Sequence, residues 1–334
     1  MRTAVVILNW NGLQHLQHYL PSVVATTPEA DIVVADNGST DGSQEWLSAE
    51  MPMVRLVSLD RNYGFAEGYN RALAMLKGYD IFVLLNSDVR TTEGWLAPLV
   101  ERLAQSEDVA VVAPKLLDDK APSRFEYAGA SGGFIDYLGY PFCRGRILNS
   151  VEEDLGQYDD AREVMWASGA ALCCRAKVFE ELGGFSSEFF AHQEEIDLCW
   201  RVWLSGRKVM VEPRSKVYHL GGATLSTASP MKCYLNHRNN LAMLYRCAPP
   251  MQRLVVAVVR PLLDMAAAVS YLVQGNPSHA KAVLRAYGDF LSWHRRLSQE
   301  RRAIRSQAQG KAPMYYGSVV MRYMFCSKLF QNMI

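Results

Sequence analysis

The sequence lacks the features of disulfide-rich, zinc-binding and nucleic-acid-binding proteins. Its seven cysteines include no Cys-x-x-Cys pair, and Cys173 and Cys174 are adjacent. We expect reduced thiols that pack as small hydrophobic side chains, because neither a disulfide framework nor a zinc site has this spacing. The formal net charge is only +1, which argues against a protein that binds nucleic acid.

A signal peptide and an uncharged membrane span are also missing. The sequence opens with the β-branched run 3–8, so we expect a protein on the cytoplasmic side of the membrane. The strongly apolar stretch 253–273 contains Arg260, Pro261 and Asp264. A spanning helix needs about 20 apolar residues without charges. We therefore do not expect this stretch to cross a membrane.

Charge is distributed unevenly along the chain. Residues 231–334 contain 15 Lys+Arg and 3 Asp+Glu, whereas residues 1–230 contain 20 basic and 31 acidic residues. The basic part also has an apolar stripe from Val283 to Leu297, flanked by arginines, which is typical of a helix lying on an anionic membrane surface. Ordinary packing, a homodimer interface and a lid over an acceptor site are the alternatives.

Strand and helix patterns alternate in the first half of the chain. Buried-strand runs occupy residues 3–8, 31–35, 54–58 and 81–85, and each of the first three is followed by a helical pattern. This alternation predicts an α/β protein with a doubly wound, mostly parallel sheet and helices on both faces.

The second half is less regular. We expect strands at 109–113, 165–172, 208–211 and 216–219, helices at 95–103, 176–182 and 194–204, and a long functional excursion over 114–160. The organisation predicted from these patterns has three parts: two halves of one α/β domain (1–105 and 106–235) and a basic, helical extension (236–334).

Polar residues follow the predicted strands where a ligand would bind an open α/β sheet. Asp88 follows the strand at 81–85 and is suited to hold a divalent metal against a phosphate. Asp36 follows the second strand, where it can contact a base or ribose, and an Asx turn is the alternative. Gly64, Gly68 and Asn70 allow close backbone approach at a helix start, as a diphosphate requires, or mark an ordinary helix start.

A third acidic group stands at the start of the predicted helix 194–204. Glu194, Glu195 and Asp197 lie in its first turn, where acids are also favoured by the helix dipole. Asp197 and Arg201 are spaced to form an i, i+4 ion pair, which is an alternative to a functional role for Asp197.

Eight segments in the same order resemble family 2 glycosyltransferases. The similarity covers roughly residues 3–240 and is closest to bacterial rhamnosyltransferases of surface-polysaccharide assembly. The segments are residues 5–12, 35–43, 62–70, 84–88, 168–170, 183–185, 189–201 and 217–222.

The resemblance implies a GT-A fold and an inverting transfer from a dTDP-, UDP- or GDP-linked sugar to a glycan or lipid-linked acceptor, with Mg²⁺ or Mn²⁺ as cofactor. It implies that Asp88, with His219, binds the metal, while Asn86 replaces the first acid of the family's Asp-x-Asp motif. Glu195 would be the general base, with Glu194 as the second choice.

The resemblance also implies that 1–105 is the nucleotide-sugar-binding half and 106–235 the acceptor-binding and catalytic half, each with its own set of substrate contacts. The nucleotide-sugar contacts are Asn9, Asn11, Asp36, Asn37, Ser39, Asn62, Gly64, Phe65, Asn70, Asn86 and Ser87. The acceptor contacts are Ser168, Gly169, Ala170 and Asp197.

Two other classes of protein remain as alternatives. A sugar nucleotidyltransferase would carry a glycine-rich loop with Lys or Arg near the N-terminus, but residues 9–20 contain neither cation. A non-catalytic sugar- or lipid-binding module would not need Asp88 together with an acidic helix start. The transferase therefore accounts for more of the sequence.

Overall fold

The computed structural model describes residues 1–221 and 229–330, so Gly222, the last residue of the final motif, lies outside the described residues. The strands are β1 (Thr3–Asn9), β2 (Asp31–Asp36), β3 (Arg55–Ser58), β4 (Ile81–Asn86), β5 (Val89–Thr91), β6 (Val109–Asp118), β7 (Gly133–Ile135), β8 (Pro141–Cys143), β9 (Arg146–Ile147), β10 (Ser150–Val151), β11 (Arg162–Glu163), β12 (Ala171–Arg175) and β13 (Lys208–His219). The helices are α1 (Leu13–Ala25), α2 (Ser43–Glu50), α3 (Gly64–Ala74), α4 (Leu96–Gln105), α5 (Ala176–Glu181), the 3₁₀ turn η1 (Ser187–Phe189), α6 (Glu194–Leu204), α7 (Pro230–Cys247), α8 (Pro250–Val273), α9 (Pro277–Ser292), α10 (His294–Ser306) and α11 (Val319–Phe325).

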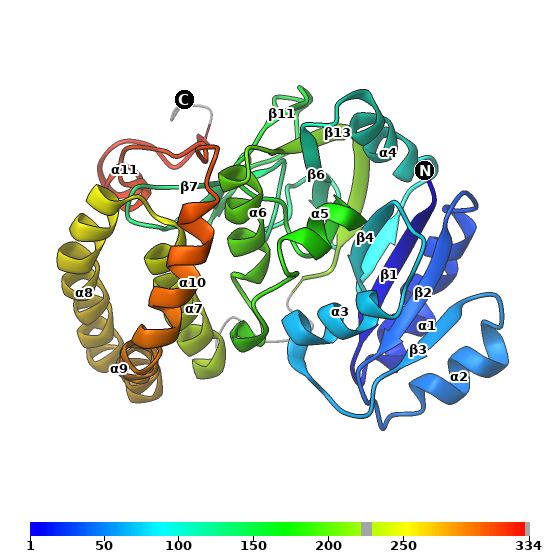
Figure 1. Ribbon diagram of the computed structural model, residues 1–334, viewed down its shortest axis with the longest axis horizontal. Coiled ribbons are helices and arrows are strands. Elements are labelled where there is room, and N and C mark those ends of the chain that lie inside the picture. Colours follow the sequence, from blue (N-terminus) through cyan, green and yellow to red (C-terminus); the bar gives the residue numbers. More distant parts are fainter. Residues whose placement is uncertain (222–228, 331–334) are drawn as a thin grey trace.

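The central sheet has the strand order β11-β13-β6-β12-β4-β1-β2-β3, and β5 pairs with β13. Strands β3, β2, β1 and β4 are parallel, while β12 runs antiparallel between β4 and β6. The predicted doubly wound α/β sheet is thus confirmed, and it joins strands from both predicted halves of residues 1–235 (Figure 1).

The sheet is covered on both faces because successive side chains of a strand point to opposite sides. On β1, Val5 and Ile7 pack in one hydrophobic cluster with side chains of α1, α2 and α4. Ala4 and Val6 pack in the other cluster, with side chains of α3, α5 and α6. This alternation places the carboxyl ends of β1, β2 and β4 at one edge of a three-layer structure, where the candidate site lies.

Two predicted strands differ from the observed ones. The strand expected at 165–172 begins only at Ala171, because Gly169 and Ala170 form a turn. The strands expected at 208–211 and 216–219 are one strand, β13, whose pairing with β6 shifts register between Glu212 and Lys216. The long excursion contains a small antiparallel sheet of β7 to β10. All seven cysteines are free, as expected.

Helices α7 to α10 stand together beyond α6 at the left of Figure 1. The apolar stripe expected to form one membrane-facing helix is divided between α9 and α10, which meet at Trp293. Val283 and Leu297 are buried, whereas Leu284 and Leu291 are exposed. Part of this stripe therefore serves ordinary packing, which was the alternative interpretation.

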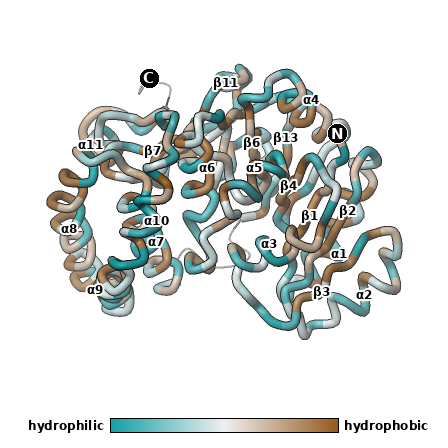
Figure 2. The backbone as a smooth tube through the Cα atoms, in the orientation of Figure 1, coloured by the Kyte–Doolittle hydropathy of each residue, from teal (hydrophilic) through white to brown (hydrophobic). Residues whose placement is uncertain are grey.

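Among the helices that the structure describes, α8 is long and apolar enough to cross a membrane, judged by length and composition alone. In its most apolar stretch, 22% is buried inside the protein. In Figure 2, α8 is coloured largely as hydrophobic.

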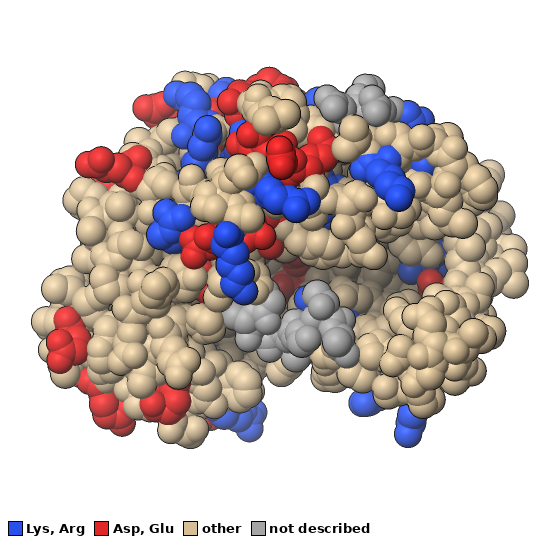
Figure 3. Space-filling view, turned by 180° about the vertical axis from the view of Figure 1, so that it is seen from behind, with Lys and Arg blue, Asp and Glu red and all other residues tan. Residues whose placement is uncertain are grey.

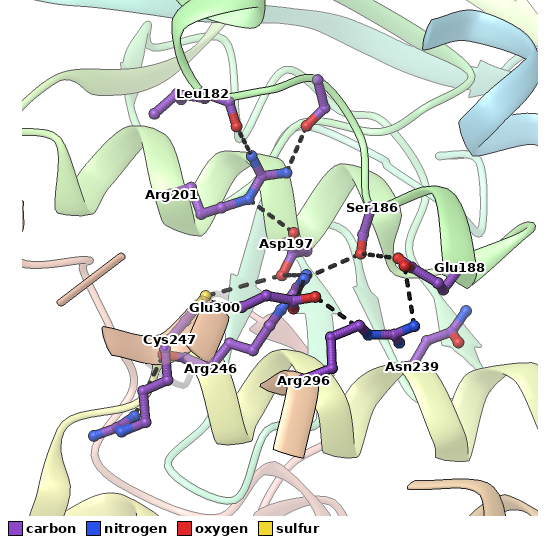
Figure 4. A network of polar contacts seen from close by, with 12 residues as sticks. Leu182, Ser186, Glu188, Asp197, Arg201, Asn239, Arg246, Cys247, Arg296 and Glu300 are labelled. Atoms are coloured by element: carbon purple, nitrogen blue, oxygen red, sulfur yellow. Dashed lines mark hydrogen bonds and ion pairs between the residues drawn. The ribbon is translucent and has the colours of Figure 1, made fainter. Parts of the chain in front are cut away.

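A buried network of ion pairs ties these helices to α6 (Figure 4). Asp197 is 0% exposed and accepts hydrogen bonds from Arg201 Nε at 2.9 Å and from Arg246 Nη2 of α7. Arg246 also pairs with Glu300 of α10 at 2.7 Å. Burial alone would raise the pKa of Asp197, but the charges of Arg246 and Arg201 outweigh it and hold this pKa below its usual value. The predicted pair of Asp197 with Arg201 is confirmed.

Asp197→Asn is expected to lower the free energy of unfolding by about 3–5 kcal/mol, because it leaves two buried guanidinium groups without their carboxylate. Urea denaturation followed by circular dichroism measures this loss. Glu163→Gln, which removes the exposed ion pair with Lys208, is the matched control and is expected to cost less than about 1 kcal/mol. Equal losses in the two variants would contradict a structural role for the buried network.

Candidate active site

A polar corner forms where β1 and β2 end side by side. Asn9 donates from Nδ2 to Asp36 Oδ2 at 3.0 Å and to Ser39 Oγ at 3.2 Å. The other oxygen of Asp36 accepts from the backbone N–H of Ser39 and from Gln44 Nε2. Asp36 therefore stabilises the loop that follows it through the residue three positions on, which is a structural role like that of an Asx turn. Oδ1 of Asn9 is buried and has no partner among the described residues, so it is an acceptor left for a ligand.

The loops after β1 and β2 carry two more of the expected contacts, Asn11 and Asn37. Asn11 has a positive φ of 48°, and its Oδ1 accepts from the backbone N–H of Thr40 at 2.8 Å. Asn37 connects its loop to the segment before α3: it donates to Asn62 Oδ1 at 3.1 Å and to the carbonyl of Gly64 at 3.0 Å. These side chains shape the corner that Asn9 and Asp36 begin.

The start of α3 is occupied by the chain itself. The backbone N–H groups of Phe65 and Ala66 both donate to the carbonyl of Phe190, at 2.6 and 3.1 Å. Gly64 has a φ of +78°, and a Cβ placed there would lie 2.4 Å from a ring carbon of Phe190. Glycine at this position thus lets Phe190 approach, which favours an ordinary helix start over a diphosphate site.

Asn70 and Gly68 also have structural partners. Asn70 exchanges two hydrogen bonds with the backbone of Phe185, at 2.8 and 2.9 Å. A Cβ on Gly68 would lie 3.0 Å from Leu8 and from Asn37, so this glycine lets α3 pack closely on β1. Their contacts with a nucleotide sugar remain predictions.

The end of β4 brings together the two predicted metal ligands. Asp88 is 4% exposed, and its Oδ1 lies 3.2 Å from Nε2 of His219, because β5 pairs with the end of β13. Nδ1 of His219 lies 3.2 Å from Glu126 Oε1. Asn86 Nδ2 lies 3.4 Å from the same imidazole, and Ser87 Oγ would lie 3.8 Å from a Cβ on Gly12 of the β1–α1 loop.

The charges of this group are strongly coupled. Burial lowers the pKa of His219, but hydrogen bonds and charge from Asp88 and Glu126 outweigh burial and raise it to about 10. Burial raises the pKa of Asp88, yet the net shift is downward because of His219. Both carboxylates therefore face an imidazolium ion when no metal is bound.

The donor atoms at this place fit part of a divalent cation's coordination shell. A carboxylate suits Mg²⁺ and Mn²⁺, and an imidazole is a common metal ligand. No group of three or more His, Cys, Asp or Glu side chains within 1–221 and 229–330 is arranged to hold a metal ion. Further ligands of the metal ion would have to come from outside the protein's side chains. This agrees with the expectation from the Asn86-Ser87-Asp88 motif, which contains only one acid.

The first turn of α6 supplies the two candidate bases. Oε2 of Glu194 and Oε2 of Glu195 are both buried without a hydrogen-bond partner among the described residues. Burial raises the pKa of Glu195 to about 7. Burial, followed by the charge of Glu195, raises the pKa of Glu194 well above its usual value. A carboxyl group that titrates near neutral pH is suited to accept a proton.

The segment 168–170 connects the base to the end of β4. The carbonyl of Ala170 accepts from the backbone N–H of Asn86 at 2.9 Å. A Cβ placed on Gly169 would lie 3.4 Å from the ring of Phe65 and 3.9 Å from Cβ of Glu195. Ser168 is 5% exposed and closes the turn through the backbone of Ala170. Gly169 thus lies against both Phe65 and Glu195.

Asp197 has a different environment. Both of its oxygens accept from arginine side chains, and the residue is fully buried. This geometry favours a structural role over the predicted contact with the acceptor.

Two groups of residues at the site were missed by sequence reasoning. Glu126 comes from the long excursion, which was expected to be functional without a named residue. Asn239 of α7 donates from Nδ2 to the carbonyls of Phe189, Ala191 and His192 at 2.7–2.9 Å. Phe190, His192 and Gln193 all have positive φ angles of 62–73°. The polar run Arg238-Asn239-Asn240 inside a helix was the signal that could have identified this support.

The site lies at the edge where β1, β2 and β4 end and α6 begins. Viewed from behind, the molecule is hollowed near its middle, and acidic side chains are visible inside the hollow (Figure 3). The end of β4, near Asp88 and His219, is linked to Glu195 through Ala170 and Gly169. This arrangement can hold a cation–phosphate group beside a proton acceptor.

Comparisons with known proteins indicate the family and the fold of the chain. Residues 4–155 match the model of Glycosyl transferase family 2. N-acetylglucosaminyl-diphospho-decaprenol L-rhamnosyltransferase of Mycobacterium tuberculosis is 27% identical over 64% of this chain and 75% of that protein. The O-antigen biosynthesis protein RfbC of Myxococcus xanthus is 26% identical over 61% of this chain and 16% of that protein.

Solved glycosyltransferase structures share the fold. S. aureus TarS 1–349 in complex with UDP has a TM-score of 0.56 at 14% identity and covers 91% of this chain and 88% of its own. Mannosyltransferase PcManGT from Pyrobaculum calidifontis, in complex with GDP-Man and Mn²⁺, has a TM-score of 0.52 at 16% identity and covers 92% and 83%. The predicted GT-A fold is confirmed. The matching family model identifies residues 4–155 as a family 2 glycosyltransferase domain, in a chain that resembles rhamnosyltransferases.

Proposed function

We propose that this enzyme transfers a sugar, with inversion, from a nucleotide-diphospho-sugar to a hydroxyl group of a glycan or lipid-linked glycan in cell-surface polysaccharide synthesis, with Mg²⁺ or Mn²⁺ as cofactor. The observation that carries the proposal is the link from the end of β4, near Asp88, to Glu195 through Ala170 and Gly169. The likeness to an L-rhamnosyltransferase supports rhamnose as the sugar.

The donor would lie along the carboxyl edge of β1, β2 and β4. Asn9 supports this placement, because its buried Oδ1 can accept a hydrogen bond from the base or a ribose hydroxyl. Asp36 would act indirectly, because its hydrogen bonds hold Asn9 and Ser39 in place. The same corner is shaped by Asn11, Asn37 and Asn62. Amide groups that are fixed in this way can select a nucleoside by hydrogen bonding.

Asp88 and His219 would hold the metal ion, with the remaining ligands from diphosphate oxygens and water. When bound, the ion neutralises the negative charge that develops on the departing nucleoside diphosphate. Glu126 would orient the His219 ring, as carboxylates that contact the second nitrogen of a metal-binding histidine do.

Glu195 would take the proton from the acceptor hydroxyl. The acceptor oxygen then attacks the anomeric carbon while the bond from that carbon to the diphosphate oxygen breaks on the opposite side. The configuration at the anomeric carbon inverts in this single displacement. Glu194 is more deeply buried, and burial followed by the charge of Glu195 raises its pKa well above the usual value, so it is the second choice for the base.

The acceptor would be carried by a membrane lipid, as the substrate of the rhamnosyltransferase relative is by its name. A peripheral position on the inner face of the plasma membrane follows from such an acceptor. The basic extension supports this position, since residues 231–334 contain 15 Lys+Arg and 3 Asp+Glu. A homodimer formed through the extension is the alternative use of that surface.

Asp88→Asn is expected to lower metal-dependent hydrolysis of the donor about a hundredfold or more, because the metal loses its protein carboxylate. The measurement is release of nucleoside diphosphate from a panel of dTDP-, UDP- and GDP-sugars with and without Mn²⁺. Asp80→Asn changes an acid just before the amino end of β4 and serves as the control that keeps activity. Hydrolysis without any need for Mn²⁺ in the native enzyme, or full activity in Asp88→Asn, would refute the metal assignment.

Glu195→Gln is expected to slow transfer about 10²–10⁴-fold while nucleotide binding is retained, because the amide cannot accept the proton. In the native enzyme the rate should fall as the pH drops through about 7, since Glu195 becomes protonated there. The residual rate of Glu195→Gln should lack this acidic limb. Glu194→Gln serves as the comparison, and loss of transfer in that variant alone would move the role of base to Glu194.

A further inference from the structure

Helix α8 is built with its polar side inward. Gln252, Arg260 and Asp264 are 1–3% exposed, which is unusual for charged and amide side chains on an outer helix. The outer side forms what we call the apolar stripe of α8, and its residues are 55–83% exposed. They are Met251, Leu254, Val258, Leu262, Val269, Leu272 and Val273.

The buried polar side fixes this orientation. Arg260 donates from Nη1 to the carbonyl of Leu138 at 2.8 Å and to Asn240 Oδ1 at 2.7 Å. Asp264 accepts from the hydroxyl of Tyr287 at 2.7 Å. Rotating α8 to bury its stripe would break these bonds and leave a buried charge without a partner. The stripe is therefore held outward, and over its 23 residues a helix is roughly 35 Å long.

A basic cavity lies beside the beginning of α8. It has a volume of about 380 Å³ and is lined by Arg253 of α8, by Arg301, Arg302 and Arg305 of α10, and by Tyr245, Pro250 and Ser298. None of the four arginines forms an ion pair with another residue that the structure describes. Glu300 of the same helix is already paired with Arg246 and Arg296.

The four cations repel one another. Burial, then the charges of Arg253 and Arg305, lower the pKa of Arg301. Arg301 and Arg305 also have a structural task, because they donate to the carbonyls of Ala248 and Cys247 where α7 ends. The side chains of Arg253 and Arg302 donate to no backbone carbonyl among the described residues. Their charge is available to an anion that enters the cavity.

We propose that this face lies on a lipid bilayer, with the apolar stripe of α8 in the interface and the phosphate of an anionic lipid in the arginine cavity. The inference rests on the proposed membrane location and specifies the surface that makes the contact. The inference assigns the membrane contact to α8 and not to the stripe from Val283 to Leu297 on α9 and α10, since part of that stripe is used in packing. A second copy of the chain fits less well, because an isologous contact through this face would bring the same unpaired arginines together.

The test is cosedimentation of the full chain with vesicles of phosphatidylcholine alone or mixed with phosphatidylglycerol. We expect binding to the mixed vesicles. The triple variant Leu254→Ser, Val258→Ser and Leu262→Ser should lower the partition coefficient about a hundredfold by removing apolar contact. The double variant Arg253→Gln and Arg302→Gln should lower it about tenfold on mixed vesicles only.

Two matched controls keep the test specific. Met53→Ser with Leu155→Ser removes exposed apolar side chains elsewhere, and Lys281→Gln with Arg295→Gln removes two exposed charges from the extension. Both controls should bind vesicles like the native chain. All variants should retain donor hydrolysis in solution, which reports the active site independently of the membrane.

Three results would overturn the inference. The native chain could fail to bind mixed vesicles, the stripe variant could bind as well as the native chain, or sedimentation velocity could show a dimer that only the stripe variant dissociates. Loss of vesicle binding with intact hydrolysis would leave the proposed function standing, and intact vesicle binding without hydrolysis would refute that function alone.

Discussion

The buried ion pair of Asp197 with Arg201 and Arg246 is the constraint on which the active site depends. It joins the middle of α6 to α7, and through Glu300 to α10 (Figure 4). The first turn of the same helix carries Glu194 and Glu195. Buried charges cost free energy unless they are fully paired, so this network specifies one arrangement of α6 rather than many. The helices beyond residue 230 are therefore part of the support for the proposed base, and they do more than cover the surface.

The loop before α6 shows the same dependence. Three non-glycine residues there have positive φ angles, a conformation that persists only where surrounding contacts fix it. Asn239 supplies those contacts from α7 by binding three carbonyls. At its other end the loop covers the start of α3 through Phe190. The result is an acidic site in which Glu195 titrates near neutral pH, while Asp88 and His219 are held together near the ends of β4 and β13.

The sheet could be predicted from the sequence because its strands are short apolar runs that end in polar turns, as 81–85 followed by Asn86-Ser87-Asp88 shows. The second half was harder. Gly169 breaks the apolar run that begins at Met165, so the strand starts at Ala171, and an irregular pairing hides the continuity of β13. Glu126 and Asn239 act through contacts between residues far apart in the chain, which no local pattern reveals. The orientation of α8 could not be read from the sequence for a similar reason: composition counts Arg260 and Asp264 against a membrane span, and only the fold shows that both are buried.

The central claim is that the metal is bound by Asp88 together with the diphosphate of the donor, and not by the protein alone. Calorimetric titration of Mn²⁺ into the protein, with and without UDP or dTDP, tests this claim directly. Weak or undetectable binding of Mn²⁺ to the free protein, and clear binding once the nucleotide is present, is the result that this account predicts. Tight binding of Mn²⁺ without nucleotide, or nucleotide binding that is indifferent to Mn²⁺, would contradict it.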